Sequence, residues 1–357
     1  MSTGPSSAGI DPVADAPGAG AHGAGAHGAA ARDQSAARPA TSAATLHAVA
    51  FVDAHLRRAE RLGRSLAEAV PDPEEFARRL ADTLAELADP AYLAGQRRVA
   101  PGIGALHGVR SPLLRAVARG FRASTRRDRA SALLFVADRL LHEPQLEARW
   151  FAFGLLRRTI DADPERSWQI IRRAAREARD WITVDTLAYV VGHGILREAY
   201  RWAELEQLTL SPSRWERRLV GSTIATLPFE DRGAGRQPEI AERGLPLLGE
   251  LIGDAVPDVQ KALSWGYRSM TLVDPPATAA ALTAETDVAA RTRDGHRAWV
   301  IRDALAKLDP GTATAIRRRL GGIRRSPGGP STSRAAAVSA RFAAMGLGRS
   351  MPEPPLT

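Results

Sequence analysis

Residues 72–87, DPEEFARRLADTLAEL, show in one stretch how this chain is built. Asp72 followed by Pro73 is a helix start signal, because the Asp side chain can cap the first turn and Pro loses no hydrogen bond there. The large apolar side chains that follow are Phe76, Leu80, Leu84 and Leu87. They recur every three or four positions, which predicts a helix that buries one apolar face.

The same signals return along the chain, and strand-like alternation is nearly absent. Further starts with Pro near the first turn are Ser111-Pro112, Glu143-Pro144, Asp163-Pro164, Ser211-Pro212, Val256-Pro257 and Pro275-Pro276. The sequence therefore predicts an all-α fold of helices joined by short polar turns. Pairs of helices returning every ~35 to 45 residues favour an α-solenoid of HEAT-like repeats over the alternative, a compact irregular bundle.

The two ends differ in composition from the middle. Residues 1–40 are rich in Ala, Gly and Ser with almost no large apolar side chains, so we expect a disordered tail. Residues 41–325 carry the helical pattern and form the predicted solenoid domain. Residues 326–357 are rich in Pro, Gly and Arg, and we expect a second disordered tail with one short helix between Arg334 and Leu347.

Composition limits the possible functions. The chain has 357 residues, 44% of them hydrophobic, which is enough for a sizeable core. It has no cysteine, which excludes disulfides, thiolate zinc sites and cysteine nucleophiles. No targeting signal or membrane span is visible, so we expect a cytoplasmic protein that does not bind membranes. A net charge of +9 favours a polyanionic partner, although an arginine-rich host proteome would give the same excess.

Three short motifs stand out, in the order W-x-x-V-D, W-x-x-R and K-A-x-x-W. They begin at Trp181, Trp215 and Lys261 and end at Asp185, Arg218 and Trp265. Their order and spacing resemble the AlkD-like DNA alkylation repair proteins, which are DNA glycosylases built from HEAT-like repeats. The resemblance covers roughly residues 90–320 and is strongest between 181 and 268.

The resemblance implies a monofunctional glycosylase that hydrolyses the N-glycosidic bond of N3- or N7-alkylated purines in base excision repair. The partner it implies is double-stranded DNA containing such lesions, bound by a monomer in a concave basic groove without base flipping. Neither a metal nor another cofactor is expected. The protein would then be cytoplasmic, and associated with the nucleoid when bound to DNA.

The resemblance also assigns roles to the motif residues. The Asp185 carboxylate would stabilise the cationic sugar of the transition state and orient water. The indole faces of Trp181 and Trp265 suit the same cation, and the Arg218 guanidinium would hold a phosphate beside the lesion. We expect these four residues to converge on one face. Further expected DNA contacts are Lys261, Arg214, Arg217 and Arg268.

Each role has a structural alternative. Asp185 could be a helix N-cap or a first-turn acid, the tryptophans could be core residues, and Arg218 could be one surface arginine among 47. At the level of function, the alternatives are a non-catalytic protein that binds distorted or branched DNA by shape, and a HEAT scaffold that binds other proteins.

Overall fold

The structure, a computed structural model, describes residues 42–345 except 101 and 103. The predicted tail over residues 1–40 and the last part of the second predicted tail, residues 346–357, lie outside the described residues. The described chain divides into two compact units, the first ending at Asp163 and the second beginning at Pro164.

The first unit contains six α-helices and one short 3-10 helix among the described residues. They are α2 (Ala43–Ser65), η1 (Leu66–Ala69), α3 (Pro73–Glu86), α4 (Pro90–Val99), α5 (Ser111–Ser124), α6 (Ala130–Leu141) and α7 (Leu146–Thr159). Helices α2 and α5 pack closely, because Gly63 lies against the Val117 carbonyl and Gly120 against the Glu60 carbonyl. A Cβ atom at either glycine would come within 2.0 Å of that oxygen.

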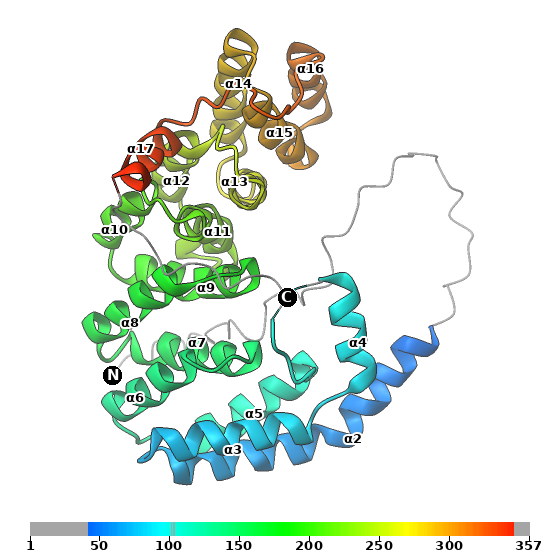
Figure 1. Ribbon diagram of the computed structural model, residues 1–357, viewed down its shortest axis with the longest axis vertical. Coiled ribbons are helices and arrows are strands. Elements are labelled where there is room, and N and C mark those ends of the chain that lie inside the picture. Colours follow the sequence, from blue (N-terminus) through cyan, green and yellow to red (C-terminus); the bar gives the residue numbers. More distant parts are fainter. Residues whose placement is uncertain (1–41, 101, 103, 346–357) are drawn as a thin grey trace, which may run out of the picture. The chain divides into compact units, whose positions relative to one another are not determined.

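The second unit continues with helices alone. They are α8 (Pro164–Glu177), α9 (Trp181–Arg197), α10 (Arg201–Leu208), α11 (Arg214–Glu230), η2 (Ala234–Arg236), α12 (Pro238–Leu251), α13 (Pro257–Met270), α14 (Pro275–Thr292), α15 (Gly295–Ala304), η3 (Leu305–Lys307), α16 (Pro310–Leu320) and α17 (Arg334–Ala344). Helices α9, α11, α13 and α15 pack on one another in succession. Each also contacts the helix that precedes it, α8, α10, α12 or α14, so the unit is built from stacked helix pairs (Figure 1).

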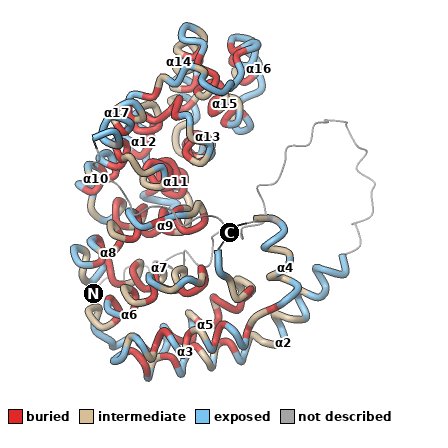
Figure 2. The backbone as a smooth tube through the Cα atoms, viewed as in Figure 1, coloured by how far each residue is buried: buried red, intermediate tan, exposed pale blue. Residues whose placement is uncertain are grey.

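Helix α11 lies at the centre of this stack, between α9 and α13. Every residue from Arg217 to Pro228 is buried, on all sides of the helix (Figure 2). Gly221 allows the close approach to α13, because a Cβ there would lie 2.9 Å from the Ala262 carbonyl carbon. The positions of side chains on α11 are therefore fixed by both neighbouring helices.

The all-helical prediction is confirmed for the described residues, where the only extended pairings are two isolated bridges, Ala88 with Val109 and Ala105 with Gln145. Most predicted starts coincide with a helix, as at Pro73, Pro164 and Pro257. A helix, α17, also forms in the predicted C-terminal tail and packs on α12. None of the described helices combines the length and hydropathy that crossing a bilayer requires.

Candidate functional site

Helix α9 begins one turn before the motif carboxylate. The Asp180 side chain is the N-cap and accepts hydrogen bonds from the Thr183 backbone N–H and hydroxyl, both at 2.7 Å. Asp185 therefore lies beyond the cap and has a different set of partners. The reading of Asp185 as a helix-start residue does not describe this structure.

The Asp185 carboxylate is held by two side chains of α11. Arg218 donates from Nη2 to Oδ2 at 2.6 Å and from Nε to Oδ1 at 3.0 Å, which is the paired, two-pronged geometry that guanidinium and carboxylate groups favour. The Ser222 hydroxyl donates to Oδ1 at 2.6 Å. Because Arg218 and Ser222 are four positions apart, they lie on the same face of α11.

Arg218 also links α11 to α13 and to the start of α9. Its Nη1 donates to the Asp258 carbonyl at 2.5 Å. Its guanidinium carbon lies 5.9 Å from the ring centre of Trp181, within the range of a cation–π contact. The structure thus brings Trp181, Asp185 and Arg218 together, although they come from two helices.

The two members of this ion pair differ in how far they are buried. The Arg218 side chain is 5% exposed, whereas 19% of the Asp185 side chain is exposed. Oδ1 accepts two hydrogen bonds and Oδ2 accepts one, so a free acceptor position remains on Oδ2. The carboxylate is therefore fixed from the protein side and still open to solvent, as a group that orients water must be.

The other two motif residues are on α13. Lys261 is exposed and Trp265 is half-buried. Asp258, Lys261 and Trp265 are spaced by three and four positions, so they lie along one face of the helix. That face begins with the carbonyl that binds Arg218, and Trp265 follows it by about 10 Å along the helix axis. The convergence of Trp265 with the other three residues remains a prediction.

The three weaker DNA-contact candidates have different surroundings. Arg214 is exposed and lies over the Trp215 ring at 4.7 Å. Arg268 bonds the Asp303 side chain and, at 3.1 Å, its carbonyl. Arg217 is buried, and its Nε donates to Asp254 Oδ2 at 2.8 Å.

Arg217 also donates to the carbonyl oxygens of Ser211 and Pro212, at 2.8 and 3.1 Å. It thus anchors the start of α11 to the loop before α13. A buried guanidinium whose donors are used in this way has a structural role, and we leave Arg217 out of the DNA contacts proposed below.

Two parts of the site were not predicted from the sequence. Ser222 could have been found, because it follows Arg218 by one helical turn. The Asp258 carbonyl could not, because a backbone acceptor has no signature in the sequence.

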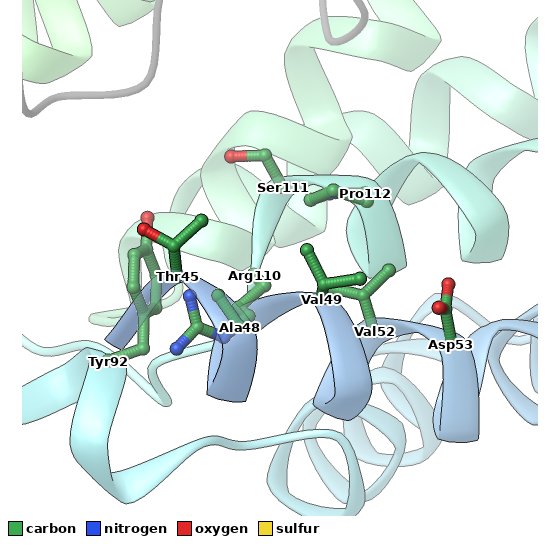
Figure 3. A pocket seen from close by; sticks show the side chains of 9 residues that line it. All are labelled: Thr45, Ala48, Val49, Val52, Asp53, Tyr92, Arg110, Ser111 and Pro112. Atoms are coloured by element: carbon green, nitrogen blue, oxygen red, sulfur yellow. The ribbon is translucent and has the colours of Figure 1, made fainter. Parts of the chain in front are cut away.

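The first unit has a separate hollow of about 360 Å³, shown in Figure 3. It is lined by Thr45, Ala48, Val49, Val52, Asp53, Tyr92, Arg110, Ser111 and Pro112. Arg110 lies over the Tyr92 ring and donates to Asp89 at 2.7 Å, so its charge is compensated. The rest of the lining is mainly small and apolar, and its other charged side chain is the exposed carboxylate of Asp53. The hollow therefore offers no uncompensated cation for a phosphate.

Comparison with known proteins gives one match. The family model described as DNA alkylation repair enzyme matches residues 80–308. The match includes helices α9, α11 and α13 with all the site residues above, and excludes α2, α16 and α17. No curated protein and no solved structure gives a significant match.

Proposed function

The chain belongs to the DNA alkylation repair enzyme family, and we propose that it is a monofunctional DNA glycosylase whose stacked helix pairs are HEAT-like repeats. Its substrate would be double-stranded DNA carrying N3- or N7-alkylated purines. It would act as a cytoplasmic monomer, without a metal or organic cofactor and without flipping the base.

The observation that carries this proposal is the Asp185 carboxylate, fixed by Arg218 and Ser222 and still partly exposed beside Trp181. An alkylated purine is already cationic and leaves readily. When the C1′–N bond breaks, both electrons go to the purine and the positive charge moves to the sugar. A carboxylate held in place near C1′ stabilises that charge without reorganising.

Water completes the reaction by adding its oxygen to C1′ and releasing a proton. The unused acceptor position on Asp185 Oδ2 can orient this water and accept its proton. Trp181, one turn before Asp185, offers a flat ring with a negative face to the same developing cation. The proposed chemistry therefore needs only groups of this chain and water.

The resemblance implies that Arg218 holds a phosphate, but its contacts in the structure support the positioning of Asp185 as its main role. Three of its N–H groups are bonded to Asp185 and Asp258, and the side chain is almost fully buried. We assign it the positioning of Asp185, with two remaining N–H groups for a phosphate oxygen. The exposed Lys261 is the better candidate for the main phosphate contact, as it lies on the face of α13 that Arg218 reaches.

The test is the release of 7-methylguanine from methylated duplex DNA by the purified full-length protein. The proposal expects release that depends on Asp185 and is lost in Asp185→Asn. Duplex binding without release, by the parental protein as well as the variant, would overturn the enzymatic assignment.

That outcome would support the second candidate, a non-catalytic protein that binds distorted DNA. The Asp185–Arg218 pair is compatible with this second candidate, because an ion pair between neighbouring helices can also have a purely structural role. Binding that prefers branched to methylated linear duplexes would be its signature.

A further inference from the structure

The end of the chain differs in charge from the rest. The C-terminal arm, which we define as residues 309–345, contains seven Arg residues and one acidic residue, Asp309. The whole chain has 49 basic and 40 acidic residues, so 42 and 39 remain outside the arm. The arm therefore contributes +6 of the net charge of +9 in about one tenth of the length. The family match ends at residue 308, immediately before it.

The arm folds onto the rest of the second unit. The Ser331 and Ser333 hydroxyls donate to the carbonyls of Gly253 and Glu250, at 2.7 and 3.0 Å. Arg325 donates to Gln260 Oε1 at 2.7 Å and lies over the Trp299 ring at 4.4 Å. The arm is thus attached to α13 at the residue next to Lys261.

Its arginines are on the surface. The seven that are described, all exposed, are Arg317, Arg318, Arg319, Arg324, Arg325, Arg334 and Arg341. Two of them have a carboxylate partner, Arg319 with Asp287 at 3.3 Å and Arg334 with Glu250 at 2.7 Å. Within residues 42–345, Arg317, Arg318 and Arg324 pair with no carboxylate.

These cations are crowded around the end of α16. Arg302 and Arg324 both donate to the Gly321 carbonyl at 3.0 Å. Burial, and then the neighbouring charge of Arg324, lower the pKa of Arg302. Of the acids in this part of the chain, Asp303 binds Arg268, Asp309 caps α16 and Asp287 pairs with Arg319. Arg317, Arg318 and Arg324 are thus left without a carboxylate partner among the described residues.

Helix capping does not account for this number of charges. Cations in the last turn of a helix do compensate its carbonyl groups, which together amount to about half a negative charge. Arg317, Arg318 and Arg319 occupy that turn of α16, with Arg324 and Arg325 just after it. Most of the positive charge is therefore left for an external anion.

We propose that the C-terminal arm is a second DNA-binding element, which holds backbone phosphates of the duplex beyond the part bound at α9, α11 and α13. The proposal rests on the proposed function for the identity of the polymer. Its chemistry is charge complementarity, because duplex DNA carries about one negative charge per 1.7 Å and neutralising its phosphates releases counter-ions. Through Arg325 and Gln260 the arm is anchored on α13, the helix that also carries Lys261 and Trp265.

The test compares two full-length double variants that lose the same charge. In Arg317→Gln/Arg318→Gln, both exposed arginines of the arm are neutralised. In the control, Arg232→Gln/Arg243→Gln, two exposed arginines of the same unit outside the arm are neutralised. Binding to a 25-base-pair undamaged duplex is measured by fluorescence anisotropy between 50 and 200 mM salt, and thermal unfolding is measured for both variants.

We expect the slope of log affinity against log salt to become shallower by about 1.8 in the arm variant, since each lost phosphate contact removes about 0.9. Raising the salt from 50 to 200 mM would then weaken DNA binding by the arm variant about tenfold less than it weakens binding by the parental protein. The control should keep the parental slope.

Equal slopes in all three proteins would overturn the proposal and leave the arginines as helix-end residues or as a site for an acidic protein. The readout is independent of catalysis, because the duplex is undamaged. If the parental protein released no 7-methylguanine but the arm variant showed the expected change of slope, the proposed glycosylase activity would be refuted. The DNA-binding role of the arm would still be supported.

Discussion

Replacing Asp185 by Asn tests the carboxylate with almost no change in shape. The variant loses the negative charge and turns one acceptor oxygen into an NH2 group that faces a guanidinium donor. Breaking a buried ion pair costs about 3 to 5 kcal/mol. Asp185 is 19% exposed, and the Asn oxygen can take the place of Oδ1 and still accept hydrogen bonds from Arg218 Nε and Ser222. We therefore expect a loss of stability of about 2 to 3 kcal/mol and a Tm lower by about 3 to 5 °C.

The effect on catalysis should be larger and of a different kind. The sugar becomes cationic only on the way to the transition state, so the carboxylate contributes mainly there. Removing one preorganised electrostatic group slows an enzyme by roughly 100- to 1000-fold. We expect a loss of this size in single-turnover release of 7-methylguanine. Affinity for duplex DNA should stay the same or rise slightly, because one repulsion with phosphate disappears.

The neighbouring residue pair provides a matched control. Asp254→Asn removes the carboxylate from Arg217, which is also on α11 and also buried. Asp254 is 1% exposed, so the loss of stability should be at least as large as for Asp185→Asn. The rate of release should remain within about threefold of the parental rate, since Asp254 is not part of the site. Both variants are assayed well below their Tm. Release by Asp185→Asn at the rate of the Asp254→Asn control would refute the catalytic role.

Other substitutions test the remaining parts. Arg218→Ala should slow release by at least tenfold, because Asp185 loses its positioning partner, and Arg218→Lys should restore little of the rate, because an ammonium group cannot make the two-pronged contact; single-turnover rates decide this. Lys261→Ala should make the salt slope of DNA binding shallower by about 0.9 and leave the release rate at saturating protein unchanged; an unaltered slope would exclude the phosphate contact. Gly221→Ala should lower Tm by several degrees, because its Cβ would lie 2.9 Å from the Ala262 backbone; an unchanged melting curve would contradict the close packing of α11 on α13. Deletion of residues 1–40 should leave salt-dependent DNA binding intact, because that stretch contains two Arg and three Asp; loss of binding in anisotropy measurements would identify it as the binder.

Local chemistry made much of the fold predictable. Asp72 and Pro73 mark a helix start wherever they fall in a protein, because capping and the missing N–H act within a single turn. The structure has α3 beginning at Pro73 and α13 at Pro257, as expected. The same local signals predicted that the motif residues lie on helices. Trp181 and Asp185, four positions apart, could therefore be placed on the same face of one helix.

Long-range pairing could not be predicted in the same way. Arg218 and Asp185 are 33 positions apart, and no spacing rule indicates that one of 47 arginines would bond that carboxylate. The burial of Arg217 beside the nearly buried Arg218 depends on how α11 lies between its neighbours. The packing of one helix against another therefore could not be predicted from the sequence.

The burial of α11 on all sides has a mechanical consequence for DNA binding. Arg218 and Ser222 extend from a helix that cannot shift without disturbing both α9 and α13. On binding, the duplex would therefore deform more than the protein, and the energy of that deformation would depend on the DNA sequence. We expect lesions flanked by easily deformed pyrimidine–purine steps to be bound more tightly than the same lesions within rigid A-tracts.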